Sequence, residues 1–213
     1  MLTVPTETAS DLVLDMIQTI TAHRVQLSEI DGAIGDGDHG INMSKGFAAA
    51  GGGLGPRSAL GPALARLGET LIEGVGGSMG PLYGGFFSSM ADALGTRAEV
   101  DAKVFSAMLA AAQASVQDMG NAKVGDKTLL DTLVPAREAF DDAVAAGLSF
   151  AECLDRMVTA ARVGRDSTRD LVARVGRASR LGERSRGVLD AGATSCCLIL
   201  ESMAASLQRA LSL

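Results

Sequence analysis

The residues best suited to chemistry lie in one twelve-residue stretch that contains Asp31, Asp36, Asp38, His39 and four glycines. Glycine permits positive φ and close backbone approach, so such a loop can fold its carboxylates around one point. Clustered carboxylates repel one another unless a cation lies between them. Mg²⁺ binds oxygen ligands, usually one or two carboxylates together with phosphate oxygens and water. The stretch therefore predicts a site for one or two Mg²⁺ ions that leaves room for the phosphates of a nucleotide.

The alternative for this stretch is a solvated acidic turn. Asp and Gly are common turn residues, and the helix dipole favours an Asp near a helix start. Asp31, His39 and Asn42 around the short Asp36–Asp38 turn weigh against that interpretation. A calcium EF-hand fits poorly, because a loop counted from Asp36 would have Phe47 rather than a bidentate Glu at its twelfth position.

A second glycine-rich segment runs from position 74 to 81 and contains Gly76, Gly77 and Ser78 ahead of a helical pattern. Backbone N–H groups at the start of a helix form a ready site for phosphate. The alternative is a tight connection between two helices, in which glycine is needed for close packing. The sequence leaves both explanations open.

The segment from Gly120 to Thr128 has most of the letters of a phosphate-binding P-loop, but Asp126 stands directly before Lys127. A P-loop also follows a strand, whereas the residues before Gly120 are Ala-rich and helical. We therefore reject the P-loop and expect a polar, glycine-containing loop between helices.

The elements that must position these loops are helical, because apolar residues recur at three- and four-residue steps. Helices are predicted from Ser10, a plausible N-cap, to about residue 27, and over residues 41–50, 60–72, 82–94, 100–119, 129–146, 150–175 and 191–210. No segment alternates with the period of a strand. The prediction is one all-α domain over residues 1–213, an antiparallel bundle of about eight helices. Alternate connections of such a bundle share one end, so the unusual loops can gather there.

The composition agrees with one helical core. The chain has 213 residues, of which 47% are apolar and only 3% aromatic, as suits closely packed Ala- and Leu-rich helices. The net charge of −6 weighs against a nucleic-acid binder. Three cysteines without paired spacing, no signal-peptide pattern and no long apolar run predict a cytoplasmic protein without disulfides or membrane spans.

Eight arginines lie close together in this acidic chain, namely Arg162, Arg165, Arg169, Arg174, Arg177, Arg180, Arg184 and Arg186. The guanidinium group suits phosphate and carboxylate partners. Most of these side chains are expected on a solvated helix face or on a surface that docks another protein. One or two are expected within reach of a ligand.

Several of these segments together resemble one known family. They are the stretches 34–43, 76–84, 125–128, 182–185 and 190–193. In this order they look like the nucleotide-binding L subunit of dihydroxyacetone kinase, the DhaL type, and are similar to the C-terminal domain of ATP-dependent dihydroxyacetone kinases. The resemblance covers nearly the whole chain. It implies an eight-helix antiparallel barrel that holds a nucleotide, ADP or ATP, in the loops at one end.

The resemblance also implies roles for individual residues. Asp31, Asp36 and Asp38 would carry two Mg²⁺ ions that bridge the nucleotide phosphates. The implied nucleotide-binding residues are His39, Gly40, Ile41, Asn42, Gly76, Gly77, Ser78, Met79, Gly120, Thr128, Leu129, Arg177, Asp190, Ala191 and Gly192. The family usually has a small hydroxyl residue at the position of Met79, so a phosphate contact through that side chain is in question and a backbone N–H could serve instead.

The resemblance further implies a partner. In this family the ketose is bound covalently to a histidine of a separate K domain, whereas this chain has only His23 and His39. His39 belongs to the acidic loop, and His23 is interpreted as a structural residue of the first helix. We therefore expect a K-type subunit to bring dihydroxyacetone to this chain, docking partly on the arginine-rich surface. A homodimer is also left open.

Three interpretations of the activity stay open. The bound ADP could remain in place and be rephosphorylated by a phosphoprotein of the phosphotransferase system. Alternatively, ATP could exchange as an ordinary substrate, and the ketose could be dihydroxyacetone or erythrulose. A different class of function is a nucleotide-loaded regulatory module that binds a transcription factor.

Overall fold

The computed structural model describes residues 2–7, 11–55 and 58–212, so the expected N-cap Ser10 lies outside the described part. Within it, the α-helices are α1 (Asp11–Ala22), α2 (Arg24–Gly32), α3 (His39–Gly51), α4 (Leu60–Gly74), α5 (Met79–Leu94), α6 (Ala102–Gly120), α7 (Leu130–Ala145), α8 (Phe150–Ser167) and α9 (Ala191–Leu211). Two 3-10 helices, η1 (Thr168–Asp170) and η2 (Arg177–Ser185), connect α8 to α9. Two short strands, β1 (Val4–Pro5) and β2 (Glu99–Val100), pair antiparallel.

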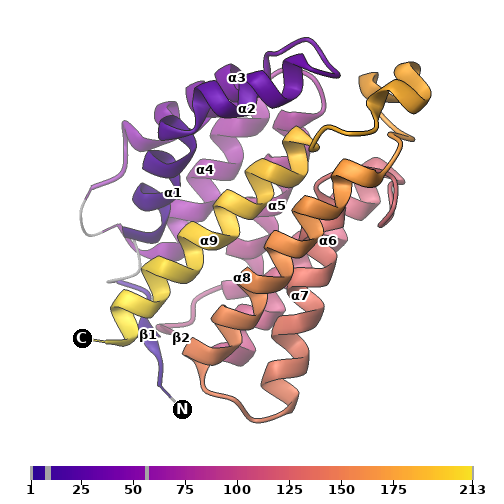
Figure 1. Ribbon diagram of the computed structural model, residues 1–213. Coiled ribbons are helices and arrows are strands. Elements are labelled where there is room, and N and C mark those ends of the chain that lie inside the picture. The colour runs from indigo at the N-terminus through magenta and orange to yellow at the C-terminus, as the bar shows by residue number, and fades with distance from the viewer. Residues whose placement is uncertain (1, 8–10, 56–57, 213) are drawn as a thin grey trace.

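The α-helices form a closed antiparallel ring (Figure 1). From α3 to α9, each helix packs against the next one along the chain. The ring closes because α9 packs against α1, and α1 packs against α3. Both α1 and α2 contact α3 and α9, so these two helices together fill one position of the ring. The predicted all-α, eight-helix antiparallel barrel is confirmed.

The connections alternate between two ends of the ring. The α2–α3, α4–α5, α6–α7 and α8–α9 connections lie at one end, which we term the site end. The other three connections, the β1–β2 pair and both chain termini lie at the opposite end (Figure 1). The expectation that the unusual loops gather at one end therefore agrees with the observed topology.

Helix boundaries differ from the predicted ones by more than three residues at two places. The first predicted helix is divided at His23, whose Nδ1 is hydrogen-bonded to the carbonyl oxygen of Thr19 at 2.8 Å. The helix predicted to reach residue 175 ends at Ser167. There the Thr168 hydroxyl donates to the carbonyl of Arg165 at 2.6 Å, so a side chain takes the place of the next helical N–H.

The strand pair was not predicted from the sequence. Val4 lies opposite Val100, and the N–H of Thr6 donates to the carbonyl of Ala98 at 2.8 Å. Two residues are too few to show the alternation that identifies a strand. The pair joins the N-terminal segment to the α5–α6 connection.

The core fills the ring with aliphatic side chains and two groups of aromatic rings. Phe47, Phe86 and Phe87 make edge-to-face contacts. All three cysteines are buried and free, as the prediction of no disulfide requires. None of the described helices is long and apolar enough to span a membrane.

Candidate active site

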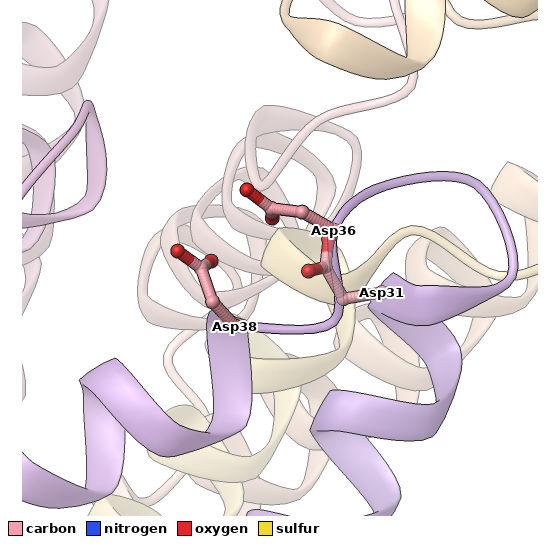
Figure 2. Close-up of side chains that lie close together, drawn as sticks. All are labelled: Asp31, Asp36 and Asp38. Atoms are coloured by element: carbon pink, nitrogen blue, oxygen red, sulfur yellow. The ribbon is translucent and has the colours of Figure 1, made fainter.

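The three aspartates come together at the α2–α3 connection. Asp31 lies in the last turn of α2, Asp36 in the loop, and Asp38 at the N-cap of α3. One carboxylate oxygen from each side chain lies within 4.8 Å of the other two. Figure 2 shows the three carboxylates directed toward one region beside the loop. This all-oxygen, triply negative donor set fits a hard cation such as Mg²⁺.

Two glycines allow this arrangement. The carbonyl of Asp31 accepts hydrogen bonds from the N–H groups of Ile34 and Gly35, which turn the chain back on itself. A Cβ at Gly35 would lie 2.5 Å from Oδ1 of Asp31, so only glycine leaves space for that carboxylate. A Cβ at Gly40 would lie 2.0 Å from the carbonyl oxygen of Arg24, so glycine is also required where α3 crosses α2.

The acidic cluster opens onto a cavity of about 590 Å³ at the site end. The predicted nucleotide-binding residues that line it are His39, Asn42, Gly76, Gly77, Ser78, Met79, Thr128, Leu129, Arg177, Asp190, Ala191 and Gly192. All four connections of the site end contribute to this wall. Residues more than 150 positions apart in the chain are thus brought to one cavity.

Three predicted nucleotide-binding residues do not line the cavity, namely Gly40, Ile41 and Gly120. Gly40 is buried against α2, while the side chain of Ile41 is 52% exposed. Gly120 ends α6. Only backbone groups of these residues remain candidates for a nucleotide contact, and that assignment stays a prediction.

The starts of three helices face this cavity, and none of them is capped by the side chain of its own N-cap residue. Their N-cap residues are Asp38 for α3, Ser78 for α5 and Leu129 for α7, and none of these side chains accepts a hydrogen bond from its own helix. The first N–H groups of a helix lack intrahelical partners and carry the positive end of the dipole. Other groups accept from two of these starts, because the N–H of His39 lies 3.4 Å from Oδ2 of Asp31 and the N–H of Leu130 donates to Oγ1 of Thr128 at 3.2 Å. The start of α5 has no such side-chain acceptor among the described residues and is therefore the best suited of the three to bind a phosphate-bearing ligand.

The glycines of the α4–α5 connection have different roles. A Cβ at Gly80 would lie 2.1 Å from the carbonyl oxygen of Val75, so close packing requires glycine there. A Cβ at Gly76 or Gly77 would meet nothing within 4 Å. Gly77 has φ +70°, which favours glycine for its backbone conformation. Packing therefore explains Gly80 but leaves Gly76 free for a ligand.

Lys127 has a structural role in the α6–α7 connection. It is 2% exposed, and four carbonyl oxygens, those of Thr168, Leu171, Ser185 and Val188, lie 2.6–3.2 Å from its Nζ and share its three N–H groups. Burial lowers the pKa of Lys127, and the nearby Asp190 opposes that effect. The ammonium group therefore ties both ends of the α8–α9 connection to α7 and is not free for phosphate. The preceding element is helix α6, which agrees with rejection of the P-loop.

Asp131 orders the same connection from the other side. Its two carboxylate oxygens accept hydrogen bonds from the N–H groups of Gly125, at 2.6 Å, and Thr128, at 2.7 Å. Thr128 and Leu129 are thereby held at the wall of the cavity.

The α8–α9 connection covers one side of the cavity. Arg177 of η2 forms an ion pair with Asp36, so a guanidinium group stands beside the acidic cluster. Asp190 caps α9 by accepting the N–H of Ala193 at 2.7 Å. Burial raises the pKa of Asp190 to about 7, and the charge of Asp131 adds to this shift.

A buried chain of hydrogen bonds supports the wall formed by α3, α5 and α9. His39 Nε2 lies 2.9 Å from Ser195 Oγ, which lies 2.6 Å from the Tyr83 hydroxyl. Burial lowers the pKa of His39 to about 4, although Asp31 nearby raises it, so the imidazole is neutral at pH 7.

The sequence prediction missed Lys45, Tyr83, Lys127 and Ser195. Lys45 lines the cavity and follows His39 and Asn42 at three-residue steps, so helical spacing from the acidic loop was a signal for it. The other three make contacts between segments distant in the chain, which single-sequence patterns do not reveal.

Residues 33–205 match the family model described as the DAK2 domain. The chain belongs to the DAK2 domain family. Among similar curated proteins is the ADP-binding subunit DhaL of PEP-dependent dihydroxyacetone kinase 2 from Listeria innocua, 36% identical over 92% of this chain and 92% of the relative. The corresponding DhaL subunit of Escherichia coli is 38% identical over 84% of this chain and 86% of its own length.

Other similar proteins are longer than this chain. L-erythrulose kinase from Pectobacterium atrosepticum is 34% identical over 88% of this chain, which covers only 32% of that enzyme. The crystal structure of dihydroxyacetone kinase from C. freundii in complex with AMP-PNP and Mg²⁺ superimposes with a TM-score of 0.68 at 23% identity, over 93% of this chain and 33% of that one. This similarity supports the same helical fold.

Proposed function

We propose that this chain is the ADP-binding subunit of a dihydroxyacetone kinase and takes part in phosphoryl transfer to a short ketose. The observation that carries the proposal is the meeting of Asp31, Asp36 and Asp38 with three helix starts around one cavity. Relatives named as DhaL subunits, 36–38% identical over most of their length, support the same assignment. We treat residues 1–213 as one domain with this function.

In this proposal, Asp31, Asp36 and Asp38 hold two Mg²⁺ ions and thereby fix the nucleotide at the site end. When bound, Mg²⁺ would neutralise charge on the phosphate oxygens, which is a large part of catalysis of phosphoryl transfer. The N–H groups at the starts of α3 and α5 bind the phosphates, and the dipole of α7 adds to the positive potential of the site. The segment 190–192 and Leu129 contact the remainder of the nucleotide.

Arg177 also receives a role in this proposal. Its ion pair with Asp36 neutralises part of the acidic cluster in the free protein. Because the guanidinium group also suits phosphate, Arg177 exchanges its carboxylate partner for the nucleotide when the cation binds. The α8–α9 connection thus closes over the ligand.

The acceptor ketose is proposed to arrive on a K-type partner subunit. Of the two histidines, His23 is hydrogen-bonded within its helix and His39 belongs to a buried hydrogen-bonded chain, so neither is suited to bind a ketose covalently. Exposed arginines of the α8–α9 connection, among them Arg174, Arg180 and Arg184, offer a docking surface at the cavity. A phosphoprotein of the phosphotransferase system would return the phosphoryl group to ADP, in the cytoplasm.

A second candidate is the kinase domain of an ATP-consuming enzyme in which ATP exchanges freely. The similarity to L-erythrulose kinase supports this candidate, and it also supports a ketose longer than dihydroxyacetone as the substrate. A nucleotide-loaded regulatory module is the alternative from another class, and it would bind nucleotide without transferring phosphate when a K subunit is present.

Native mass spectrometry of the freshly purified chain, before and after extensive dialysis, separates these candidates. Retained ADP with two Mg²⁺ ions supports a resident cofactor, which requires nanomolar binding, about −12 kcal/mol. A chain that is empty but takes up ATP with Mg²⁺ supports the exchanging kinase. A chain that takes up neither nucleotide would contradict the proposed function.

A further inference from the structure

We propose that Ser195, whose hydroxyl contacts that of Tyr83, is a positioning residue that holds His39 in its Nε2–H tautomer, so that Nδ1 faces the cavity as a hydrogen-bond acceptor. The tautomer follows from the structure of the free protein alone. Its consequence for ligand recognition rests on the proposed function, because it concerns the same cavity.

The three side chains come from three different helices of the ring. His39 starts α3, Tyr83 lies in the second turn of α5, and Ser195 lies in the second turn of α9. Tyr83 is 2% and Ser195 0% exposed, so water does not compete for their hydroxyl groups. Both hydroxyls also lie near the carbonyl oxygen of Gly192, at 3.0 Å from Tyr83 and 3.1 Å from Ser195.

Counting protons decides the tautomer. Four short contacts connect the groups: His39 with Ser195, Ser195 with Tyr83, and each hydroxyl with the carbonyl of Gly192. Each hydroxyl supplies one proton, and the carbonyl supplies none. If His39 carries its proton on Nε2, three of the four contacts become hydrogen bonds. If the proton is on Nδ1, only two do, so the buried chain favours Nε2–H.

The other ring nitrogen is directed to a different environment. Among the described residues, Nδ1 of His39 has no hydrogen-bond partner, and the buried side-chain atom without a partner is instead Ser28 Oγ. Nδ1 is therefore not sealed within the protein, and His39 lines the cavity. In the Nε2–H tautomer, Nδ1 presents a lone pair there.

This lone pair restricts what His39 can recognise. Phosphate oxygens and the neighbouring carboxylates are acceptors, so an unprotonated Nδ1 forms no hydrogen bond with them. It accepts instead from an O–H or N–H donor, either a water molecule held by the cation or a hydroxyl or amino group of the nucleoside. His39 thus orients a hydrogen-bond donor within the phosphate site. Because the imidazole is uncharged, it does not repel the cation.

Long-range ¹⁵N–¹H NMR of the histidine side chains at pH 7.5 measures the tautomer in the free protein. With only two histidines in the chain, His23→Gln assigns the His39 signals. For His39, we expect Nδ1 to have the ¹⁵N chemical shift of an unprotonated nitrogen and Nε2 to have that of a protonated nitrogen. Ser195→Ala should move both shifts toward a tautomer mixture, and Ser195→Thr should restore them.

Ser206→Ala provides the matched control, because Ser206 is a buried serine of the same helix whose recorded side-chain partner is Arg209. It should leave the His39 shifts unchanged. Ser195→Val is the second variant, in case Ser195→Ala fails to fold, and should shift the population in the same direction. Tyr83→Phe keeps the contact between His39 and Ser195 and should alter the tautomer little. A protonated Nδ1 in the unmodified protein, or shifts unaltered in both Ser195→Ala and Ser195→Val, would overturn the inference.

Nucleotide binding separates this inference from the proposed function. If calorimetry detects no binding of ADP with Mg²⁺ to the unmodified chain, the proposed function fails, while the tautomer result stands. If ADP binds, Ser195→Ala should weaken it about tenfold and Ser206→Ala should not. Equal affinity of the two variants for ADP would contradict the proposed positioning role of Ser195.

Discussion

The N-cap side chains at the two ends of the helical ring differ in whether they cap the helix that follows them. At the opposite end, Asp101 accepts the N–H of Val104 at 2.8 Å and thereby caps α6, and Ser149 with Glu152 forms a complete capping box at α8. At the site end, the N-cap side chains of α3, α5 and α7 make no capping bond, although Thr128 Oγ1 accepts the first N–H of α7 at 3.2 Å. The N-cap side chains therefore satisfy the first N–H groups of α6 and α8, whereas the first N–H groups of α5 are left available where a ligand is proposed to bind.

Two helices qualify this comparison. At the opposite end, α4 has no side-chain cap, but its first N–H, from Leu60, donates to the carbonyl of Thr6 at 3.0 Å. At the site end, α9 is capped by Asp190, whose pKa burial raises to about 7. The lack of a bond from the N-cap side chain is thus shared by α3, α5 and α7 but not by every helix at that end.

The largest effect should come from the metal ligands. Asp38→Ala removes one of three carboxylates around the cation, so we expect affinity for ADP in the presence of Mg²⁺ to fall more than about 100-fold, with helicity nearly unchanged. Isothermal titration calorimetry and circular dichroism measure the two quantities. Asp142→Ala, an exposed change on α7, is the control. Undiminished binding in both Asp36→Ala and Asp38→Ala would exclude the metal assignment.

Lys127→Met should lower stability rather than remove a phosphate contact. The variant leaves four carbonyl oxygens of the α8–α9 connection without their charged donor. We expect a loss of about 3 kcal/mol in the free energy of unfolding, measured by urea denaturation. Lys123→Met, an exposed lysine in the same loop, should change stability by less than about 0.5 kcal/mol. Equal stability of the two variants would contradict the structural role.

Substitutions at two glycines of the α4–α5 connection should distinguish a role in packing from a role in ligand binding. Gly80→Ala places a Cβ against the carbonyl of Val75 and should cost about 2 kcal/mol of stability. Gly76→Ala meets open space and should cost less than about 0.5 kcal/mol, yet lower nucleotide affinity. Thermal unfolding and calorimetry measure both variants. A Gly76→Ala protein that is destabilised but binds nucleotide with unchanged affinity would show that Gly76 serves packing and not binding.

The smallest effect compares two serines at helix N-caps. Ser149→Ala breaks the capping box of α8 and should cost about 1 kcal/mol without altering nucleotide binding. Ser78→Ala removes no capping bond from α5, so stability should change by less than about 0.5 kcal/mol. Equal losses of stability in urea denaturation would contradict the difference between the two ends of the ring.

Local patterns in the sequence predicted the helices and the acidic loop. Aspartates 31, 36 and 38 are close in the chain, so glycine-rich spacing was enough to expect their convergence. The periodic spacing of leucine and alanine predicted the helices of the ring. These signals are contained within a few turns of chain, where sequence and structure correspond most directly.

Other features depend on contacts between distant segments. The end of α8 at Ser167 belongs to a connection whose Thr168 and Leu171 carbonyls are held by Lys127, about forty positions earlier. Likewise, the chain from His39 to Ser195 joins residues 156 positions apart. Such contacts form only when the ring closes, so no local pattern predicts them.

The most direct test of the account maps backbone N–H groups by ¹⁵N NMR during titration with ADP and Mg²⁺. The account predicts the largest shifts in the first turns of α3, α5 and α7, which face the cavity, and among these at α5, whose first N–H groups have no side-chain cap. The first turns of α6 and α8, capped by Asp101 and Ser149, should shift little. Shifts concentrated at α6 and α8, or none at the site end under saturating ligand, would contradict the proposed site.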